Sequence, residues 1–324
     1  MDRDSIIAGL GQDWEKMKGL LHSSLSSDVS LLDDINADLL SNTGKMLRPL
    51  LTLYVARMCN GGILRDERIR NAAAVEILHN ATLLHDDVAD EAMLRRGAPT
   101  VMSKLGPVPA VLVGDFWLAS AVALLSDSSD LKWTIAEFAR TLTDLAEGEM
   151  LQQQKAFLSD TTVEDYLRII YCKTGSLFVT ACETGAQSVG ASREYLQAAG
   201  RYGRALGIAF QIRDDILDYA GGETTGKPVG IDLKEQKITL PLLGALSKAK
   251  DEKGIREKIH DIRLHPDNCE SIRSFVLENG GVEYAEEKQM GYVEEAIQAL
   301  SVFPDCREKE VLEFIARHNA VRTK

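Results

Sequence analysis

The chain has 324 residues, of which 45% are hydrophobic and 27% are charged, and its formal net charge is −12. This length allows one large domain or two ordinary ones, and the composition excludes a disordered chain. The acidic balance argues against a nucleic-acid binder, although basic residues gathered at one place could still bind a polyanionic substrate.

Few prolines, few aromatic residues and few alternating β-branched runs predict an all-α protein. The five cysteines lack CxxC spacing, which is typical of reduced thiols in a cytoplasmic protein. The N-terminus has no long apolar core like that of a signal peptide. We also expect no transmembrane segment, because Pro109, Gly114 and Asp115 interrupt the most apolar stretch, residues 108–125.

Residues 5–40 have the amphipathic pattern of two helices, separated near Ser26. Pro49 then suits the first turn of another helix, where its missing N–H costs nothing. Lys45 and Arg48 therefore lie at a loop-to-helix entry, where backbone N–H groups also point outward. This is either an anion site or a pair of ordinary surface cations.

A long helix is predicted over residues 67–90, and it ends in Asp86, Asp87 and Asp90. The spacing i, i+1, i+4 places these side chains within about 100° of the helix surface. Carboxylates packed so closely repel unless a cation lies among them, and oxygen ligands suit Mg2+. The alternative is a solvated acidic face. His79 lies two turns earlier on nearly the same stripe, as either a packed core residue or a substrate contact.

A basic loop with Arg95 and Arg96 follows, and the apolar helix expected over residues 109–125 is predicted to be central to the core. Another helix should run from Leu131 to about Lys155. Thr162 and Asp165 resemble a capping pair that starts the next helix. That helix reaches residues 172–175, where Gly175 indicates a break or kink. Lys173, beside this break, is either a cation facing the acidic site or a surface lysine.

A second long helix, over residues 193–219, ends in Asp214, Asp215 and Asp218 at the same spacing. Because the motif recurs, we expect a cage of six carboxylates that holds several divalent ions and a polyanion. Residues 221–237 form a glycine-rich loop with Lys227 and Lys237, which suits a lid that closes over phosphates. Residues 240–324 add amphipathic helices without chemistry of their own. We therefore predict one domain over residues 1–324.

Two carboxylate faces that hold Mg2+ and are surrounded by basic residues would bind a diphosphate and neutralise its negative charge. If the diphosphate leaves from carbon, this promotes ionisation of the C–O bond. The resulting cation needs an apolar pocket poor in water, and the helices before both triads are apolar. Apart from His79 and His85, these helices contain few side chains that could act as a general base. This favours ionisation and addition over hydrolysis.

Five motifs occur in order along the chain: GKMLRP, LLHDDVADEAMLRRG, KTG, QIRDDILD and GKPVGIDLKEQKITLP. Through them the chain resembles, over essentially its full length, the trans-isoprenyl diphosphate synthases of the polyprenyl synthetase family. The resemblance implies a single all-α domain with helices around a deep central cavity, usually as a homodimer. It also implies head-to-tail condensation of isopentenyl diphosphate with an allylic diphosphate such as geranyl or farnesyl diphosphate. About three Mg2+ ions would act in each active site.

The resemblance also assigns roles to residues. The metal ligands would be Asp86, Asp87, Asp90, Asp214, Asp215 and Asp218. The allylic diphosphate would contact Arg95, Lys173, Thr174, Gln211, Lys227 and Lys237, and isopentenyl diphosphate would contact Lys45, Arg48, His79 and Arg96. Of these, the expected catalytic residues are Asp86, Asp87, Asp90, Lys173, Asp214, Asp215 and Lys227. One departure is Gln236, where the family commonly has glycine before the lysine.

Product length in the family depends on side-chain bulk just before the first triad. Ala81 and Thr82 are both small there, although only Thr82 lies on the acidic stripe and the role of Ala81 rests on the resemblance alone. The sequence HNATLLHDDVADE resembles that of long-chain members such as octaprenyl diphosphate synthases. Phe116 and Trp117 on the neighbouring helix would then close the product pocket at a greater depth. We expect an all-trans product of about C40 for a quinone side chain.

Three alternatives stay open. A short-chain farnesyl or geranylgeranyl diphosphate synthase differs only in its product. A metal-dependent phosphohydrolase would use His79 and the pair His85–Asp86, but it would need more histidine ligands near the aspartates. A non-catalytic partner subunit would be expected to lose residues of the acidic triads, and none is missing here.

Overall fold

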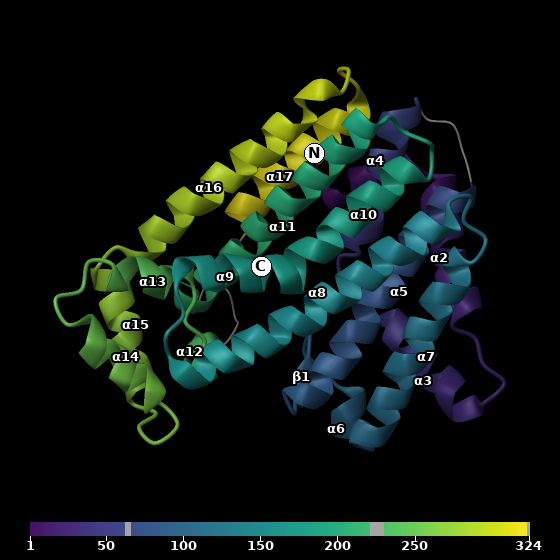
Figure 1. Ribbon diagram of the computed structural model, residues 1–324. Helices are drawn as coiled ribbons and strands as arrows, with labels where there is room; N and C mark the ends of the chain where they lie inside the picture. The colour runs from purple at the N-terminus through teal and green to yellow at the C-terminus, as the bar shows by residue number, and fades with distance from the viewer. Residues whose placement is uncertain (62–65, 221–229, 323–324) are drawn as a thin grey trace. The chain divides into compact units, whose positions relative to one another are not determined.

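The computed structural model describes residues 1–61, 66–220 and 230–322 (Figure 1). Within these ranges the chain is helical apart from one short hairpin, β1 (Leu94–Arg95) and β2 (Ala98–Pro99), so the all-α prediction is confirmed. The chain divides into two compact units, each built from separate stretches. Unit 1 comprises Met1–Ala139, Thr180–Ala199 and Phe303–Leu312, and unit 2 comprises Arg140–Val179, Gly200–Val302 and Glu313–Lys324.

The N-terminal segment forms three helices where we expected two. Gly11 has φ +53°, which glycine adopts readily, and it separates α1 (Arg3–Leu10) from α2 (Gln12–Ser24). The helix α3 (Ser30–Ser41) then begins close to the predicted break. Met46 precedes α4 (Leu47–Asn60), and Pro49 lies in the first turn of that helix, as predicted.

The helix α5 (Asp66–Ala89) is the centre of unit 1 and packs against α2, α4 and α7 (Figure 1). It is buried on nearly all sides between residues 68 and 78, as expected for a helix inside a core. Arg68 on this helix is fully buried, and its Nη2 lies 2.5 Å from Asp13 Oδ2. Arg57 approaches the same carboxylate at 3.0 Å, so the buried charges are paired.

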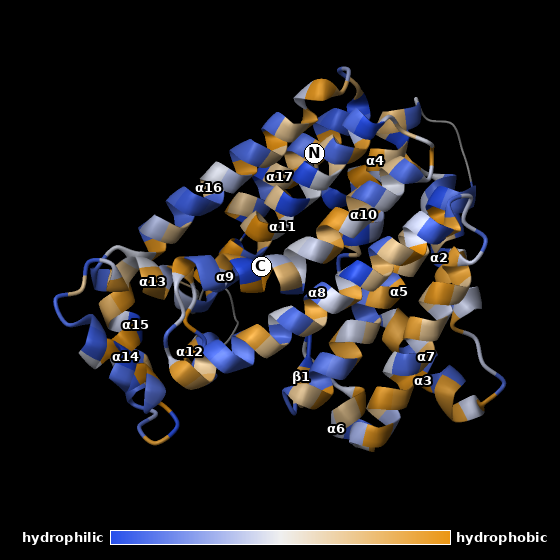
Figure 2. Cartoon of the chain, viewed as in Figure 1, coloured by the Kyte–Doolittle hydropathy of each residue, from blue (hydrophilic) through white to orange (hydrophobic). Residues whose placement is uncertain are grey.

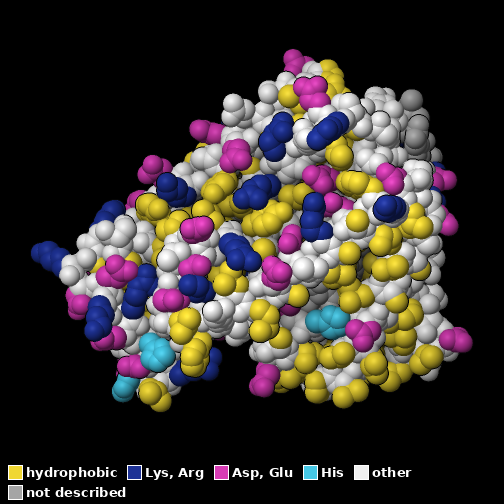
Figure 3. All heavy atoms as spheres, in the orientation of Figure 1, with side chains coloured by type: hydrophobic (Ala, Val, Ile, Leu, Met, Phe, Trp, Pro, Cys, Tyr) yellow, Lys and Arg dark blue, Asp and Glu magenta, His cyan; other side chains and the backbone are white. Residues whose placement is uncertain are grey.

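The helix α7 (Pro107–Leu125), which follows α6 (Val101–Leu105), is less buried than we predicted. Only its inner stripe, which includes Val113 and Trp117, lies in the core. Its outer stripe leaves Val108, Leu112 and Val122 exposed at 67%, 62% and 51%, and hydrophobic side chains gather over this region in Figure 3. Among the described residues, α7 is the one helix long and apolar enough to cross a membrane, a property that core helices share.

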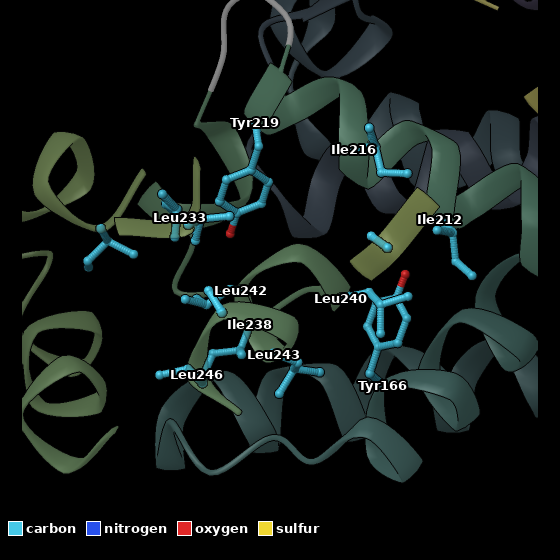
Figure 4. Packing of buried hydrophobic residues seen from close by; sticks show 14 of the residues in the cluster. Tyr166, Ile212, Ile216, Tyr219, Leu233, Ile238, Leu240, Leu242, Leu243 and Leu246 are labelled. Carbon is cyan, nitrogen blue, oxygen red and sulfur yellow. The ribbon is translucent and has the colours of Figure 1, made fainter. Parts of the chain in front are cut away.

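Unit 2 is built around the later part of α11 (Arg193–Ala220). Ile212, Ile216 and Tyr219 of α11 belong to one buried cluster with Leu240 and Leu243 of α13 (Leu240–Leu246), as Figure 4 shows. The other helices that lie wholly in this unit are α9 (Val163–Ile170), the π-helix η1 (Tyr171–Gly175), α12 (Ile231–Lys234), α14 (Glu252–His260), α15 (Asn268–Glu278), α16 (Gly281–Ala299) and the short η2 (Leu300–Val302).

Four of the boundaries between the units fall inside the helices α8 (Leu131–Leu158), α10 (Ser176–Gln187), α11 and α17 (Arg307–Val321), and the fifth follows η2 directly. Hydrophilic and hydrophobic stretches alternate along α8 and α16 in Figure 2, as amphipathic helices require. The predicted cap of α9 is confirmed: Asp165 N–H donates to Thr162 Oγ1, and the Asp165 carboxylate accepts from Thr162 N–H.

Candidate active site

The first acidic motif ends α5, and its three carboxylates lie in different surroundings. Asp87 is buried, and its Oδ1 accepts a hydrogen bond from Arg95 Nε at 2.7 Å. Burial raises the pKa of Asp87, although Arg95 opposes that rise. Asp86 is half-buried and Asp90 is exposed. Residues i and i+4 of a helix are about 40° apart and residue i+1 is about 100° away, so Asp86 and Asp90 share the open stripe.

The hairpin after this motif holds the two arginines. Arg95 pairs with Ala98 across the strands, which leaves Arg96 and Gly97 as a two-residue turn with φ +54° and +80°. Positive φ at both positions is the type I′ pattern, and it strains an arginine. Arg96 Nη1 donates to Asn42 O at 2.9 Å, and the guanidinium packs against Gly44. A Cβ on Gly44 would lie 2.5 Å from the guanidinium carbon and would displace the guanidinium, and φ at Gly44 is +69°, which favours glycine.

Basic side chains surround His79. Burial, together with Arg48, Arg96 and Arg95, lowers the pKa of His79 well below 6.5, so its imidazole is neutral at pH 7. Burial also lowers the pKa of Arg48 to about 10. Glu76, one turn before His79, is 2% exposed, and burial raises its pKa although Arg48 opposes this. A neutral imidazole can still donate one hydrogen bond to an anion.

The remaining predicted residues of unit 1 lie close to these groups in sequence. Lys45 is exposed and follows Gly44, against which Arg96 packs. Ala81 is fully buried. Thr82 is half-buried, and its Oγ1 donates to His79 O at 2.8 Å, so its own helix satisfies the hydroxyl. His85 Nε2 lies 3.3 Å from Asp115 Oδ1 on α7.

In unit 2 the predicted kink is the π-helix η1, which contains Lys173 and Thr174. Such single turns of π-helix often occur at functional sites. Thr174 Oγ1 donates to Gln211 Oε1 at 2.8 Å, and Gln211 Nε2 donates to Asp215 Oδ1 at 2.9 Å. Tyr166 Oη donates to Asp215 Oδ2 at 2.7 Å. One buried carboxylate therefore links α9, η1 and α11.

A pocket of about 160 Å³ opens beside this network, and its charged lining includes Lys173, Asp215, Asp232 and Lys237. Lys173 Nζ lies 2.5 Å from Glu149 Oε2 on α8. Burial would raise the pKa of Glu149, but the nearby Lys173 holds it below the ordinary value. Lys237 Nζ contacts Glu235. Both lysines are thus held by carboxylates at or near the pocket.

Four carboxylates crowd the end of α11 and the start of α12. Burial and the neighbouring Asp232 raise the pKa of Asp215 well above its ordinary value. Burial and the neighbouring Asp218 raise the pKa of Asp232 to about 7. Asp214 Oδ1 lies 2.9 Å from Arg322 Nη2, and Asp218 accepts the N–H groups of Ile231 and Asp232 at 3.1 Å each. This excess of negative charge favours a bound cation.

The chemistry of the donors fits Mg2+. The acidic motifs supply only carboxylate oxygens, and Mg2+ typically takes one or two carboxylates and completes its shell with water and phosphate oxygens. Within the described ranges, no group of three or more acidic, histidine or cysteine side chains gathers closely enough to hold a metal alone.

The structure places the predicted residues in both units. Unit 1 holds Lys45, Arg48, His79, Ala81, Thr82, Asp86, Asp87, Asp90, Arg95 and Arg96. Unit 2 holds Lys173, Thr174, Gln211, Asp214, Asp215, Asp218 and Lys237. Lys227 lies outside the described residues.

Several residues that interact with the predicted site residues were not predicted from the sequence: Glu76, Glu149, Tyr166, Asp232 and Arg322. A signal existed for Tyr166, which lies seven residues before Lys173 and thus on the same helical stripe. Asp232 lies in the same short segment as Lys237. The ion pair of Arg322 with Asp214 joins residues far apart in sequence and gave no local signal.

Known proteins resemble this chain over most of its length. The family model described as polyprenyl synthetase matches residues 29–276. The all-trans-nonaprenyl-diphosphate synthase (geranyl-diphosphate specific) of Rhodobacter capsulatus is 36% identical, over 97% of this chain and 96% of the relative. The octaprenyl diphosphate synthase of Escherichia coli (strain K12) is also 36% identical, over 99% of both chains.

A solved structure is similar over almost the whole chain. The polyprenyl synthase of Caulobacter crescentus CB15, complexed with calcium and isoprenyl diphosphate, superposes with a TM-score of 0.92 at 35% identity. The match covers 100% of this chain and 98% of that one. The chain belongs to the polyprenyl synthetase family. It is a prenyltransferase.

The hydrogen bond from Tyr166 to Asp215 yields a first prediction. The substitution Tyr166→Phe removes the donor and leaves the buried carboxylate less well oriented. The resemblance predicts Asp215 as a metal ligand, and losing a partner that orients a metal ligand typically costs 10- to 100-fold in metal affinity. We therefore expect the Mg2+ concentration for half-maximal prenyl transfer to rise by about tenfold or more. A titration of activity with Mg2+ measures this.

Tyr292→Phe is the matched control, because Tyr292 packs against the same hydrophobic cluster. We expect its Mg2+ requirement to equal that of the unsubstituted protein. An unchanged Mg2+ requirement in Tyr166→Phe would contradict the role of this hydrogen bond.

Proposed function

We propose that the chain condenses isopentenyl diphosphate head to tail onto an allylic diphosphate such as geranyl or farnesyl diphosphate. The product is a long all-trans polyprenyl diphosphate of about C40, for a quinone side chain. The observation that carries this proposal is the near full-length similarity to octaprenyl and nonaprenyl diphosphate synthases. The crowded carboxylates of unit 2 support it, because their negative charges favour a bound cation. We also propose that the enzyme is cytoplasmic.

The metal ligands of the proposal are the six aspartates of the two acidic motifs, with about three Mg2+ ions. Asp87 and Asp215 also accept hydrogen bonds from Arg95 and Tyr166, respectively. Mg2+, when bound, supplies the Lewis acidity that stabilises the departing diphosphate. Lys173, Lys227, Lys237 and Arg95 add positive charge around that diphosphate, and Thr174 and Gln211 orient Asp215.

Isopentenyl diphosphate binds, in this proposal, among Lys45, Arg48, Arg96 and His79. The arginines that lower the pKa of His79 would attract its diphosphate, and the neutral imidazole donates a hydrogen bond. The allylic C–O bond breaks and leaves an allylic cation and free diphosphate. The double bond of isopentenyl diphosphate then forms the new C–C bond to that cation. A proton is lost to the released diphosphate, which restores a double bond.

Product length is a prediction that mass spectrometry checks directly. With farnesyl diphosphate, isopentenyl diphosphate and Mg2+, we expect products of about C40. Ala81→Phe adds a bulky ring at a fully buried position of α5, and we expect it to shorten the products. Ala81→Ser, which hardly changes the volume, is the control and should keep the original length. Accumulation of C15 or C20 products alone by the unsubstituted enzyme would contradict the long-chain proposal.

We also propose a homodimer in which the outer stripe of α7 meets a second copy of itself. Val108, Leu112 and Val122 expose apolar surface on one face of this helix. An apolar patch of this kind commonly marks an interface, and one helix face can pair with itself about a twofold axis.

Light scattering during size-exclusion chromatography tests the dimer. We expect twice the chain mass of 35.6 kDa for the unsubstituted protein and a single chain mass for Leu112→Glu, which places a charge in the interface. Leu264→Glu is the control, since Leu264 is 77% exposed but lies far along the chain from α7. A monomeric unsubstituted protein, or a dimeric Leu112→Glu variant, would contradict this interface.

A further inference from the structure

The residue before Lys237 has an unusual backbone conformation. The helix α12 ends in a Schellman motif, in which Gln236 N–H donates to Leu233 O at 2.9 Å and Lys237 N–H donates to Asp232 O at 2.8 Å. Gln236 has φ +61°, in the left-handed region that the C′ position of this motif requires. Glycine usually occupies that position, because any side chain is strained there. A glutamine therefore needs a compensating interaction.

The side chain of Gln236 provides that interaction. It is buried at 8% exposure, and its Nε2 donates to His260 O at 2.6 Å and to Ile259 O at 3.3 Å. These carbonyls belong to the last turn of α14, and Ile259 O also accepts from the N–H of Ile262 at 3.2 Å. The amide thus caps α14 and ties the end of α12 to it.

The start of α12 is tied as well. Gly230 N–H donates to Asp218 O at 3.0 Å, and the Asp218 carboxylate accepts from the first N–H groups of α12. The segment of residues 230–237 is therefore held by α11 at its start and by α14 at its end. Lys237 follows the second attachment directly and lines the pocket beside Lys173 and Asp215.

We propose that Gln236 is a positioning residue, which fixes Lys237 in the pocket by anchoring the end of α12 to α14. The inference rests on the proposed function, in which Lys237 contacts the allylic diphosphate. Glycine would adopt this backbone conformation with less strain, so the glutamine serves through its side chain. Its effect on catalysis passes through Lys237 and not through direct contact with substrate.

Steady-state kinetics with both substrates test this role. Gln236→Ala removes the anchor and keeps the strain. Gln236→Asn tolerates the left-handed conformation and keeps the amide, but the side chain is one methylene too short. We expect both variants to raise the KM for the allylic diphosphate by about fivefold or more and to leave that for isopentenyl diphosphate within about twofold. In a Lys237→Ala background, the same substitutions should change the allylic KM by less than about twofold.

Three results would overturn the proposal. These are an unchanged allylic KM in Gln236→Asn, equal increases in both KM values, or an equal effect in the Lys237→Ala background. If Gln236→Ala fails to fold, Gln236→Gly replaces it, because glycine relieves the strain while removing the anchor. Amide hydrogen exchange at Lys237 gives a readout independent of activity, and loss of the anchor should accelerate it. An unsubstituted enzyme without allylic condensation would refute the proposed function, while the exchange measurement would still test the anchor.

Discussion

Electrostatic repulsion among carboxylates at the end of α11 is the constraint on which unit 2 depends. Burial raises the pKa of both Asp215 and Asp232, and a neighbouring carboxylate adds to each rise, Asp232 for Asp215 and Asp218 for Asp232. Each carboxylate has a different compensating neighbour. Arg322 pairs with Asp214, Tyr166 and Gln211 donate to Asp215, the first turn of α12 donates to Asp218, and Lys237 opposes the charge of Asp232. These contacts join α9, α12 and Arg322, which follows α17, to the end of α11 within unit 2, and a divalent cation would relieve the remaining repulsion.

In unit 1, positively charged side chains outnumber carboxylates around His79. Burial, together with Arg48, Arg96 and Arg95, lowers the pKa of that histidine, and Arg48 and Arg96 also act on the buried carboxyl of Glu76. A strained type I′ turn and a close approach to Gly44 hold Arg96 in this group. Such a group suits a diphosphate that binds without metal, whereas the crowded carboxylates of unit 2 suit one that binds through metal ions. In the proposal, isopentenyl diphosphate is the substrate that binds without metal, and the allylic diphosphate is the one that binds through Mg2+.

Much of this could be predicted from the sequence, because it depends on local pattern. The long helices that end in the two acidic motifs, the cap of α9 and the irregular turn at Lys173 all have near-neighbour signals. Two features could not be predicted in the same way. The burial of α7 depends on which neighbours cover it, and periodicity alone did not reveal that one face stays open. The hydrogen bond from Gln236 to α14 joins residues 24 positions apart, so the sequence indicated only a missing glycine.

Thermal unfolding with Mg2+ and inorganic pyrophosphate tests the central proposal, that the acidic motifs bind metal ions and diphosphate. A ligand present at about 100 times its Kd stabilises the folded state by about 2.7 kcal/mol. We expect Mg2+ and pyrophosphate together to raise the Tm by a few degrees, more than either alone, and Asp214→Asn to lose most of this rise. A Tm that does not respond to the pair, or an equal rise in Asp214→Asn, would contradict the account.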